Sequence, residues 1–323
     1  MYKIGVVGAG HLGKIHIKIL QEADFVDFVG FYDSDDQIRK SISAELNIKS
    51  FESYNELINN VDIVDIVTPT LSHFNCAKLA LQAKKHIFIE KPVTNTIDEV
   101  KKLITLTNQA GVKAQVGHVE RFNPAFIEAK KQILKPKFIE VHRLAQFNTR
   151  GTDVSVILDL MIHDLDIILH IVNQPIKSIH ASGVAVVSNT PDIANARIEF
   201  INGCVANVTA SRMSLNNMRK SRFFQKDAYI SVDFLNKKYE YISLEEITED
   251  QPFIPILDLG ARGKKKIMVQ SEKSSETNPI EEELKSFVNS IQTNKNPIVD
   301  LKSAQSALQL ALDIAEQITM TQN

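Results

Sequence analysis

The sequence contains little cysteine and no tryptophan. Cys76 and Cys204 are its only cysteines, and they form no Cys-x-x-Cys or Cys/His ligand pattern. A disulfide scaffold and a structural zinc site therefore both lack residues, and we expect no metal centre. Since disulfide-poor chains are typical of reducing compartments, we expect a cytoplasmic protein.

An excess of one charge is also missing. Lys and Arg number 37 against 39 Asp and Glu, which gives a net charge of -2. Nucleic-acid and anionic-membrane binding depend on a positive surface, so neither is an expected partner. The most apolar stretch, Val156 to Val172, contains Asp159, His163 and Asp166 and is too polar to span a bilayer. The segment MYKIGVVGAG shows neither a charged leader nor a cleavage site, and we expect no export signal.

The chain of 323 residues has room for about two domains. The first 120 residues alternate short apolar runs with amphipathic stretches, which predicts βαβ units and an α/β domain with a doubly wound parallel sheet over residues 1–120. Helices are expected on both faces of this sheet. The expected strands are Lys3 to Val7, Val26 to Tyr32, Asp62 to Val67, His86 to Ile89 and Lys113 to Val116, and the expected helices are Leu12 to Gln21, Asp35 to Leu46, Leu71 to Ala83 and Ile97 to Ala110.

Longer strand-like runs follow and predict a second, α+β domain with an antiparallel sheet over residues 121–323. Residues Leu244 to Asn278 are polar, and we expect the lysine run Lys264 to Lys266 to lie in a weakly ordered, solvated loop. Two helices should close the chain, from Asn278 and from Leu301. The expected strands are Phe138 to Phe147, Ile176 to Val187, Ala194 to Phe200, Val205 to Arg212 and Ala228 to Asp233.

A glycine-rich loop, Gly8 to Gly13, joins the first strand to the first helix. Gly8 suits a tight turn, Gly10 allows the backbone to approach a pyrophosphate, and Gly13 allows close helix-strand packing. The start of the helix would supply N–H donors to the phosphates. Such loops also arise for structural reasons alone, but here the strand-to-helix context predicts a dinucleotide site.

Asp33 ends the next strand, 20 residues beyond Gly13, where a carboxylate accepts hydrogen bonds from the adenosine ribose. The acidic run Asp33 to Asp36 would repel a 2′-phosphate in the absence of an adjacent Arg, so we predict NAD as cofactor and NADP as less favoured. Arg39 and Lys40 are expected to be surface charges, although one of them could reach back to Asp33. His16 and His73 are expected to be helix-surface or packing residues.

Two further motifs carry reactive side chains. Glu90-Lys91-Pro92 follows a strand at the carboxyl edge of the sheet, where open α/β folds bind ligands, although Lys-Pro alone is typical of a turn. Asp159 and His163 stand at i and i+4 and would share one face of a helix. A carboxylate beside an imidazole orients the ring and favours its protonated form. A structural helix pair is the alternative for these two residues.

With these motifs in this order, the sequence resembles the Gfo/Idh/MocA oxidoreductases, the group of glucose-fructose oxidoreductase and inositol 2-dehydrogenase. The resemblance covers nearly the whole chain and includes the helix from Pro279 to Phe287 with Pro297 downstream. It implies a Rossmann domain and a second domain with a large open, mostly antiparallel sheet. It also implies that this sheet forms the interface of a homodimer or homotetramer. It also implies nicotinamide chemistry on sugars or cyclitols.

The resemblance assigns Lys91, Asp159 and His163 to catalysis. Removing hydride from a carbinol requires a base for the hydroxyl proton, and His163 suits that role. Asp159 would orient the ring, and the Lys91 ammonium would stabilise negative charge on oxygen. The residues expected to bind cofactor are Gly8, Gly10, His11, Leu12, Gly13, Asp33, Thr68, Pro69, Glu90 and Lys91, and those expected to bind substrate are Lys91, His118, Arg121, Arg150 and His163.

The segment Gly117 to Pro124, the approach Arg150 to Asp153 and Met161 are similar to a sub-branch of UDP-N-acetylglucosamine 3-dehydrogenases. This implies oxidation of a nucleotide-sugar 3-hydroxyl. Arg121 is either a substrate contact or a structural ion-pair donor, and Met161 either packs in the core or narrows the substrate pocket. Candidates for holding a diphosphate are Arg143, Arg150, Arg212, Arg219 and Arg222, because guanidinium groups bind phosphate oxygens in pairs.

Two competing functions remain. A reductase of dihydrodiol or biliverdin type would not require both Asp159 and His163. A non-catalytic NAD(H)-binding sensor would not require Lys91 either. The presence of all three residues therefore favours a sugar or nucleotide-sugar dehydrogenase.

The acidic run that begins at Asp33 predicts tighter binding of NADH than of NADPH, because the 2′-phosphate of NADPH would meet carboxylates. Titration followed by the fluorescence of the nicotinamide measures both affinities, and the chain has no tryptophan to interfere. Equal or tighter binding of NADPH would show that Asp33 does not have this role.

Overall fold

The computed structural model describes residues 1–148, 154–247, 255–273 and 276–322. The chain forms two compact units, Met1–Val119 with Asn278–Gln309 and Glu120–Thr277 with Leu310–Asn323. We expected residues 278–309 in the second domain. They join the first unit because α8 (Pro279–Gln292) buries Leu284, Phe287 and Val288 in the core beside α1 (His11–Glu22). The predicted functional division at residue 120 stays a prediction.

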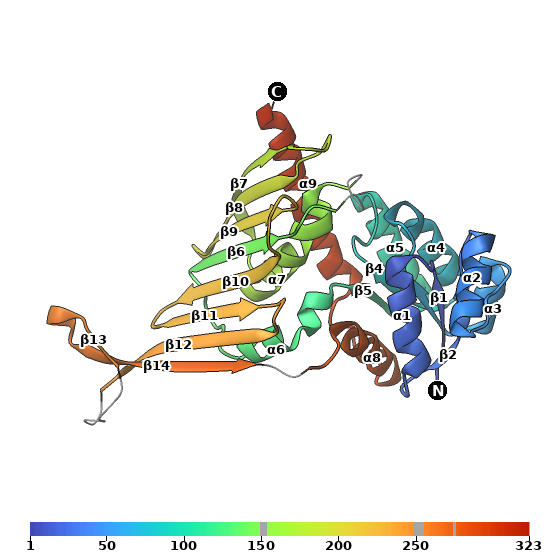
Figure 1. Cartoon of the computed structure of the whole chain (residues 1–323), viewed down its shortest axis with the longest axis horizontal. Coiled ribbons are helices and arrows are strands. Elements are labelled where there is room, and N and C mark those ends of the chain that lie inside the picture. The colour runs from blue at the N-terminus through green and yellow to red at the C-terminus, as the bar shows by residue number, and fades with distance from the viewer. Residues whose placement is uncertain (149–153, 248–254, 274–275, 323) are drawn as a thin grey trace. The chain divides into compact units, whose positions relative to one another are not determined.

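The first unit contains a five-stranded parallel sheet in the order β2-β1-β3-β4-β5. Figure 1 labels β1, β2, β4 and β5 of this sheet. Each predicted strand and helix of this part is present, with ends within one residue of those expected, and the predicted Rossmann-type fold is confirmed. The short helix α3 was not predicted. The strands are β1 (Lys3–Val7), β2 (Asp27–Tyr32), β3 (Ile63–Ile66), β4 (His86–Glu90) and β5 (Ala114–Gly117), and the remaining helices are α2 (Asp36–Leu46), α3 (Tyr54–Asn60), α4 (Thr70–Gln82) and α5 (Ile97–Ala110).

Helices cover both faces of this sheet because successive strand residues point to opposite sides. Ile4 and Val6 of β1 belong to the core that contains residues of α1 and α8. Gly5 lies between them and faces the opposite side of the sheet. A Cβ built on Gly5 would lie 2.9 Å from the Val61 side chain and 3.1 Å from that of Leu57. Burial on both sides explains why strands such as β3 are apolar almost throughout.

The strand order places a topological switch point between β1 and β3. The chain leaves β1 toward β2 on one side and returns to β3 on the other. Open α/β sheets bind ligands at the carboxyl ends of such neighbouring strands. The glycine loop follows β1 and Thr68 follows β3, so both lie at this position.

The second unit contains a nine-stranded sheet in the order β13-β14-β12-β11-β10-β6-β9-β8-β7. Its neighbours are antiparallel except for β6 and β9, so the predicted large, mostly antiparallel sheet is confirmed. The strands β10, β12, β13 and β14 were not predicted. The strands are β6 (Phe138–Leu144), β7 (Ile176–Val184), β8 (Ile193–Phe200), β9 (Val205–Ser211), β10 (Met218–Gln225), β11 (Ala228–Asp233), β12 (Lys238–Glu246), β13 (Ile256–Asp258) and β14 (Lys264–Lys273).

Burial alternates along the central strands, as expected when one face packs and the other is solvated. In β8, Ala196 and Ile198 are buried, whereas Asn195 and Arg197 are exposed. Gln317 of the last helix, α9 (Leu301–Gln322), donates a hydrogen bond to the carbonyl oxygen of Ile179 in β7 and so links the helix to this strand. The helical elements outside the first unit's list are η1 (Val119–Phe122), α6 (Pro124–Lys130), the π-helical turn η2 (Ile157–Met161), α7 (Ile162–Val172), η3 (Gly260–Arg262) and α9 (Leu301–Gln322).

The lysine run Lys264 to Lys266 was expected in a solvated loop, and this was wrong. Of the stretch Leu244 to Asn278, for which weak order was predicted, residues 248–254 and 274–275 lie outside the described residues. It begins β14, which pairs along β12. Lys265 lies 2.8 Å from an Asp227 carboxylate oxygen, and Lys266 lies 3.1 Å from one of Glu245. Glu245 lies on β12, next to β14, and opposite charges on adjacent strands stabilise their pairing, so a polar run can form a strand here.

Buried ion pairs hold α7 in the second unit. Arg143 of β6 donates two hydrogen bonds to Asp164, at 2.6 and 3.0 Å, and a third to Glu120 at 2.9 Å. Arg121 binds both carboxylate oxygens of Asp166. These side chains are all less than a tenth exposed. Burial raises the pKa of Asp164, and the adjacent Arg143 opposes that shift.

None of the helices within the described ranges has the length and apolar character needed to cross a membrane.

Replacing Arg143 with Leu should lower the free energy of unfolding by about 3–5 kcal/mol, because it leaves Asp164 and Glu120 buried without their cation. Arg222→Leu is the matched control. Its pair with Glu140 is partly exposed, at 27% and 38%, and should contribute about 0–1 kcal/mol. Urea unfolding measures both variants, and equal stability would contradict the structural role given to Arg143.

Candidate functional site

The glycine loop after β1 is closely packed at two positions and open at a third. Gly8 has φ +93°, and a Cβ there would lie 2.7 Å from the backbone N of Thr68. A Cβ on Gly13 would lie 2.0 Å from the carbonyl oxygen of Gly8. Gly10 is exposed, and a Cβ there would have no neighbour within 4 Å. The loop therefore presents bare backbone to open space at Gly10.

The first turn of α1 continues from this open position. Its N-cap is Gly10, and no side chain caps the helix. The N–H groups of His11 and Leu12 therefore have no intrahelical acceptor, and the positive end of the helix dipole lies beside them. A pyrophosphate fits both features. The residues present thus suit a dinucleotide.

Asp33 holds the glycine loop in place. Its carboxylate accepts hydrogen bonds from the backbone N–H groups of Ala9, at 2.7 Å, and Asp35, at 2.9 Å. The predicted position beside the loop is therefore observed, while its contact with a ribose stays a prediction.

Arg39 differs from its expected place on the surface. Its side chain is 11% exposed, and its guanidinium donates to the Asp33 carbonyl at 2.8 Å and lies 5.7 Å from the centre of the Tyr32 ring. The structure therefore supports the alternative, in which one of the two cations, here Arg39, reaches back to Asp33. Lys40 pairs with Asp36 at 2.7 Å and is exposed, as expected.

His73 links two of the predicted cofactor loops. Its ring nitrogens lie 2.9 Å from the carbonyl oxygen of Pro92 and 2.8 Å from that of Thr68. The residue is buried, and burial lowers its pKa. The loop at Thr68-Pro69 after β3 and the loop at Glu90 to Pro92 after β4 are therefore joined through one side chain.

His16 is neither a surface residue nor an ordinary packing residue. It lies fully buried between Asp65 of β3, 2.9 Å from Nδ1, and Glu90 of β4, 3.4 Å from Nε2. Burial disfavours its charged form, but the two carboxylates prevail and raise the pKa of His16 well above its ordinary value. Glu90 in turn accepts a hydrogen bond from the Lys91 backbone N–H at 3.1 Å.

Asp159 and His163 lie on one continuous helical segment of the second unit. Asp159 is in the π-helical turn η2, and His163 is the second residue of α7. Both side chains are partly exposed. The predicted helical spacing of one turn is therefore present. Isolated π-helical turns occur often at functional sites. Met161 between them is fully buried, which is the core-packing alternative.

The residues predicted to bind substrate are in part buried, and one of them lies outside the described residues. His118 is 1% exposed, and Arg121 is an ion-pair donor to Asp166, so neither offers a free side chain in this structure. Arg150 lies outside the described residues. Among the diphosphate candidates, Arg143 and Arg212 are buried in ion pairs with Asp164 and Asp192, and Arg222 pairs with Glu140. Arg219 keeps 51% of its side chain exposed.

The buried acids that pair with His16, Arg121 and Arg143 were not identified from the sequence. Asp65 interrupts an apolar strand, and Asp164 and Asp166 interrupt an apolar helix. Acids are almost never fully buried unless they are paired, so their positions alone indicated hidden cations. Across the described part of the chain, no cluster of His, Cys, Asp or Glu side chains is arranged to hold a metal ion.

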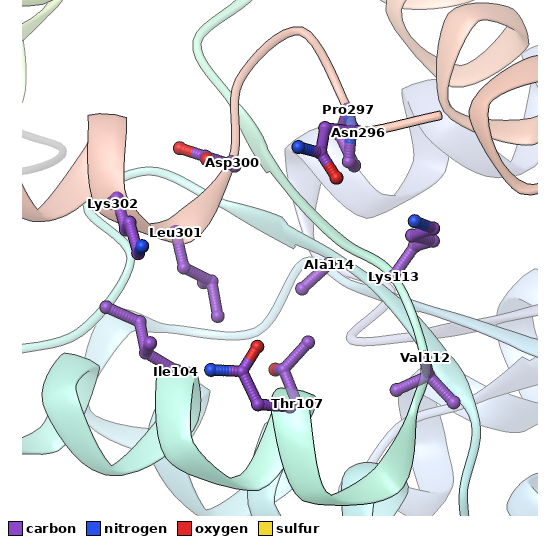
Figure 2. A pocket seen from close by; sticks show the side chains of 11 residues that line it. Ile104, Thr107, Val112, Lys113, Ala114, Asn296, Pro297, Asp300, Leu301 and Lys302 are labelled. Carbon is purple, nitrogen blue, oxygen red and sulfur yellow. The ribbon is translucent and has the colours of Figure 1, made fainter. Parts of the chain in front are cut away.

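A cavity of about 220 Å³ lies elsewhere in the first unit (Figure 2). Ile104 and Thr107 of α5 form one wall, and Leu301 and Lys302 at the start of α9 form another. Ala114 places this cavity at the beginning of β5, whereas the dinucleotide loops follow the ends of the strands. It therefore does not belong to the predicted site.

Gly10 and Gly13 should respond differently to replacement by alanine. Gly10→Ala should fold with wild-type stability, because its Cβ meets open space, but should bind NADH at least tenfold more weakly by blocking the approach to the backbone. Gly13→Ala should lose stability as well, because its Cβ would collide with the Gly8 carbonyl. Thermal unfolding and nicotinamide fluorescence measure the two effects. Normal NADH binding by Gly10→Ala would contradict the assignment of this loop.

Known proteins match both units. The family described as "Oxidoreductase family, NAD-binding Rossmann fold" matches residues 2–118, and the GFO/IDH/MocA C-terminal domain matches residues 132–225. UDP-N-acetylglucosamine 3-dehydrogenase of Acidithiobacillus ferrooxidans is 39% identical over 235 residues, which cover 72% of this chain and 74% of that protein. The scyllo-inositol 2-dehydrogenase (NAD(+)) of Bacillus subtilis is 30% identical over 66% of this chain and 68% of its own length.

A solved structure of the Acidithiobacillus ferrooxidans UDP-N-acetylglucosamine 3-dehydrogenase has a TM-score of 0.89 and 32% identity, and covers 98% of this chain and 97% of its own. These relatives are named dehydrogenases, so the predicted enzyme class, an oxidoreductase acting on CH–OH groups, is confirmed. The chain belongs to the Gfo/Idh/MocA family of NAD-binding oxidoreductases.

Proposed function

We propose that this protein is an NAD-dependent dehydrogenase that oxidises a secondary hydroxyl of a nucleotide sugar, with the 3-hydroxyl of UDP-N-acetylglucosamine as the first candidate. The open, uncapped start of α1 at Gly10 carries the cofactor part of this proposal. Asp33 beside that loop supports NAD over NADP. The similarity to a UDP-N-acetylglucosamine 3-dehydrogenase supports the substrate part. A homodimer or homotetramer through the large sheet stays a prediction.

Oxidation of a secondary alcohol removes a hydride from carbon and a proton from oxygen. Bound NAD supplies the hydride acceptor. His163 takes the hydroxyl proton as general base, and Asp159, one turn earlier on the helix, orients the imidazole and balances its charge. The Lys91 ammonium stabilises the negative charge that grows on the same oxygen.

A nucleotide sugar also requires a partner for its diphosphate. Arg219 suits this task among the candidate arginines because its guanidinium is half exposed. Its Nη1 lies 3.9 Å from a carboxylate oxygen of the buried Glu120. This distance is an ion pair without a hydrogen bond, so the contact orients the guanidinium without using its N–H donors. We include Arg219 in the proposal as the contact to the diphosphate.

His163→Ala should bind NADH normally and lose at least 10²-fold in turnover, because it removes the base and leaves the dinucleotide loop intact. The assay mixes protein and NAD with UDP-sugars, free sugars and inositols and follows the absorbance of NADH. Unchanged turnover would remove His163 from the mechanism.

The same panel separates the competing functions. Activity confined to UDP-sugars, with a raised KM in Arg219→Ala, is the expected result. Silence across the panel together with tight NADH binding would favour a non-catalytic sensor. Activity confined to free sugars or inositols would overturn the nucleotide-sugar assignment.

A further inference from the structure

A charged triad lies beneath the dinucleotide edge of the first unit and has no part in the proposed chemistry. It consists of His16 on α1, Asp65 on β3 and Glu90 on β4. His16 and Asp65 are completely inaccessible to solvent, and the Glu90 side chain is 9% exposed. The Phe88 ring lies beside the imidazole at a centroid distance of 6.0 Å. Three ionisable groups have thus been brought together in an apolar layer, where each would be costly alone.

The imidazole joins the two carboxylates through different nitrogens. Nδ1 lies 2.9 Å from Asp65 and forms a hydrogen bond, whereas Nε2 lies 3.4 Å from Glu90 at ion-pair distance. A carboxylate on each side of an imidazole favours the protonated form, in which both nitrogens carry a proton. This arrangement agrees with the raised pKa of His16 and with the pKa of Glu90, which burial alone would raise but which the charges of His16 and Lys91 lower.

Glu90 is confined on its other sides. Its Oε2 accepts the hydrogen bond from the Lys91 backbone N–H. A Cβ on Gly117 of β5 would lie 2.5 Å from Oε1, so only glycine leaves room for this carboxylate. The charge of Glu90 also acts on Asp65, on Lys91 and on His73, whose ring nitrogens lie against the carbonyls of Thr68 and Pro92. The position of the Lys91 backbone therefore depends on Glu90, and that of Glu90 depends on His16.

We propose that His16 is a positioning residue for Lys91: the buried imidazole holds the Glu90 carboxylate against the Lys91 amide and thereby fixes where the lysine side chain begins. This inference rests on the proposed role of Lys91 in turnover. His16 touches neither substrate nor cofactor. Its effect passes through Glu90 alone, which separates it from a general contribution to stability.

Two substitutions of His16 test this path separately. The amide nitrogen of Gln can take the place of Nε2, which faces Glu90, whereas that of Asn can take the place of Nδ1, which faces Asp65. His16→Asn should therefore lose about 10–100-fold in kcat, the range typical of positioning groups, with KM and NADH affinity nearly unchanged. His16→Gln should recover much of that loss. Lys18→Gln, an exposed change on the same helix, is the control and should match the wild type.

A purely structural role predicts another pattern. The two His16 variants would then lose thermal stability but keep the wild-type kcat while folded, or would lose activity equally. Either result would overturn the proposal.

Nuclear magnetic resonance of the wild-type protein gives a readout that needs neither activity nor a variant. With ¹⁵N-labelled histidine, the His16 ring should lose its proton at a higher pH than an ordinary histidine, whose pKa is about 6.5. Because its pKa is raised, any stability from this charge is present at low pH and is lost as pH rises through the pKa of the folded state. The Lys91 amide resonance should shift in that same titration. A His16 ring that titrates at or below the ordinary histidine pKa, or a Lys91 amide that does not respond, would overturn the inference. If the enzyme shows no turnover on any sugar, the proposed function fails and this measurement alone decides on His16.

Discussion

A charge buried among apolar side chains persists only when an opposite charge lies against it, and this constraint organises both units. In the first unit, His16 lies between Asp65 and Glu90. In the second, Arg143 pairs with Asp164 and Glu120. Each cluster lies directly under a residue that we assign to chemistry. Glu90 precedes Lys91, and Asp164 follows His163.

These pairs explain how flexible side chains can act at fixed positions. Lys91 follows a strand end and His163 is the second residue of a helix, so the place of each side chain depends on the backbone that carries it. Bidentate arginine–carboxylate contacts fix α7 against β6, and the triad fixes the backbone at Lys91. Polar groups in the interior thus restrict geometry, whereas the backbone at Gly10 on the carboxyl edge faces open space.

Much of the fold was predictable because its signals are local. Alternating apolar runs and amphipathic stretches defined the strands and helices of the first unit to within one residue, and the glycine loop marked the dinucleotide edge. Parallel strands gather their carboxyl ends at one edge, so Asp33, Thr68 and Lys91 could be assigned to it from chain order alone. The family resemblance supplied the roles of Asp159 and His163, which spacing alone left open.

The remaining features depend on partners far apart in sequence. His16 and Asp65 are separated by 49 residues, and Arg121 and Asp166 by 45, so no local pattern pairs them. The run Lys264 to Lys266 is typical of a solvated loop when taken alone, but in the structure acidic residues of β12 lie opposite it. Asp65 and Asp164 were visible as acids in apolar segments. Their positions indicated a buried cation without identifying it.

The central claim is that Lys91 and His163 act on the same substrate oxygen in one step, and a double-mutant cycle tests it most directly. The rates compared are kcat for the wild type, Lys91→Met, His163→Ala and the double variant with UDP-N-acetylglucosamine and NAD. Residues that act as a unit are strongly non-additive, so the double variant should be little slower than the slower single variant. A double variant whose loss equals the product of the two single losses would show that the residues act independently and would contradict the account.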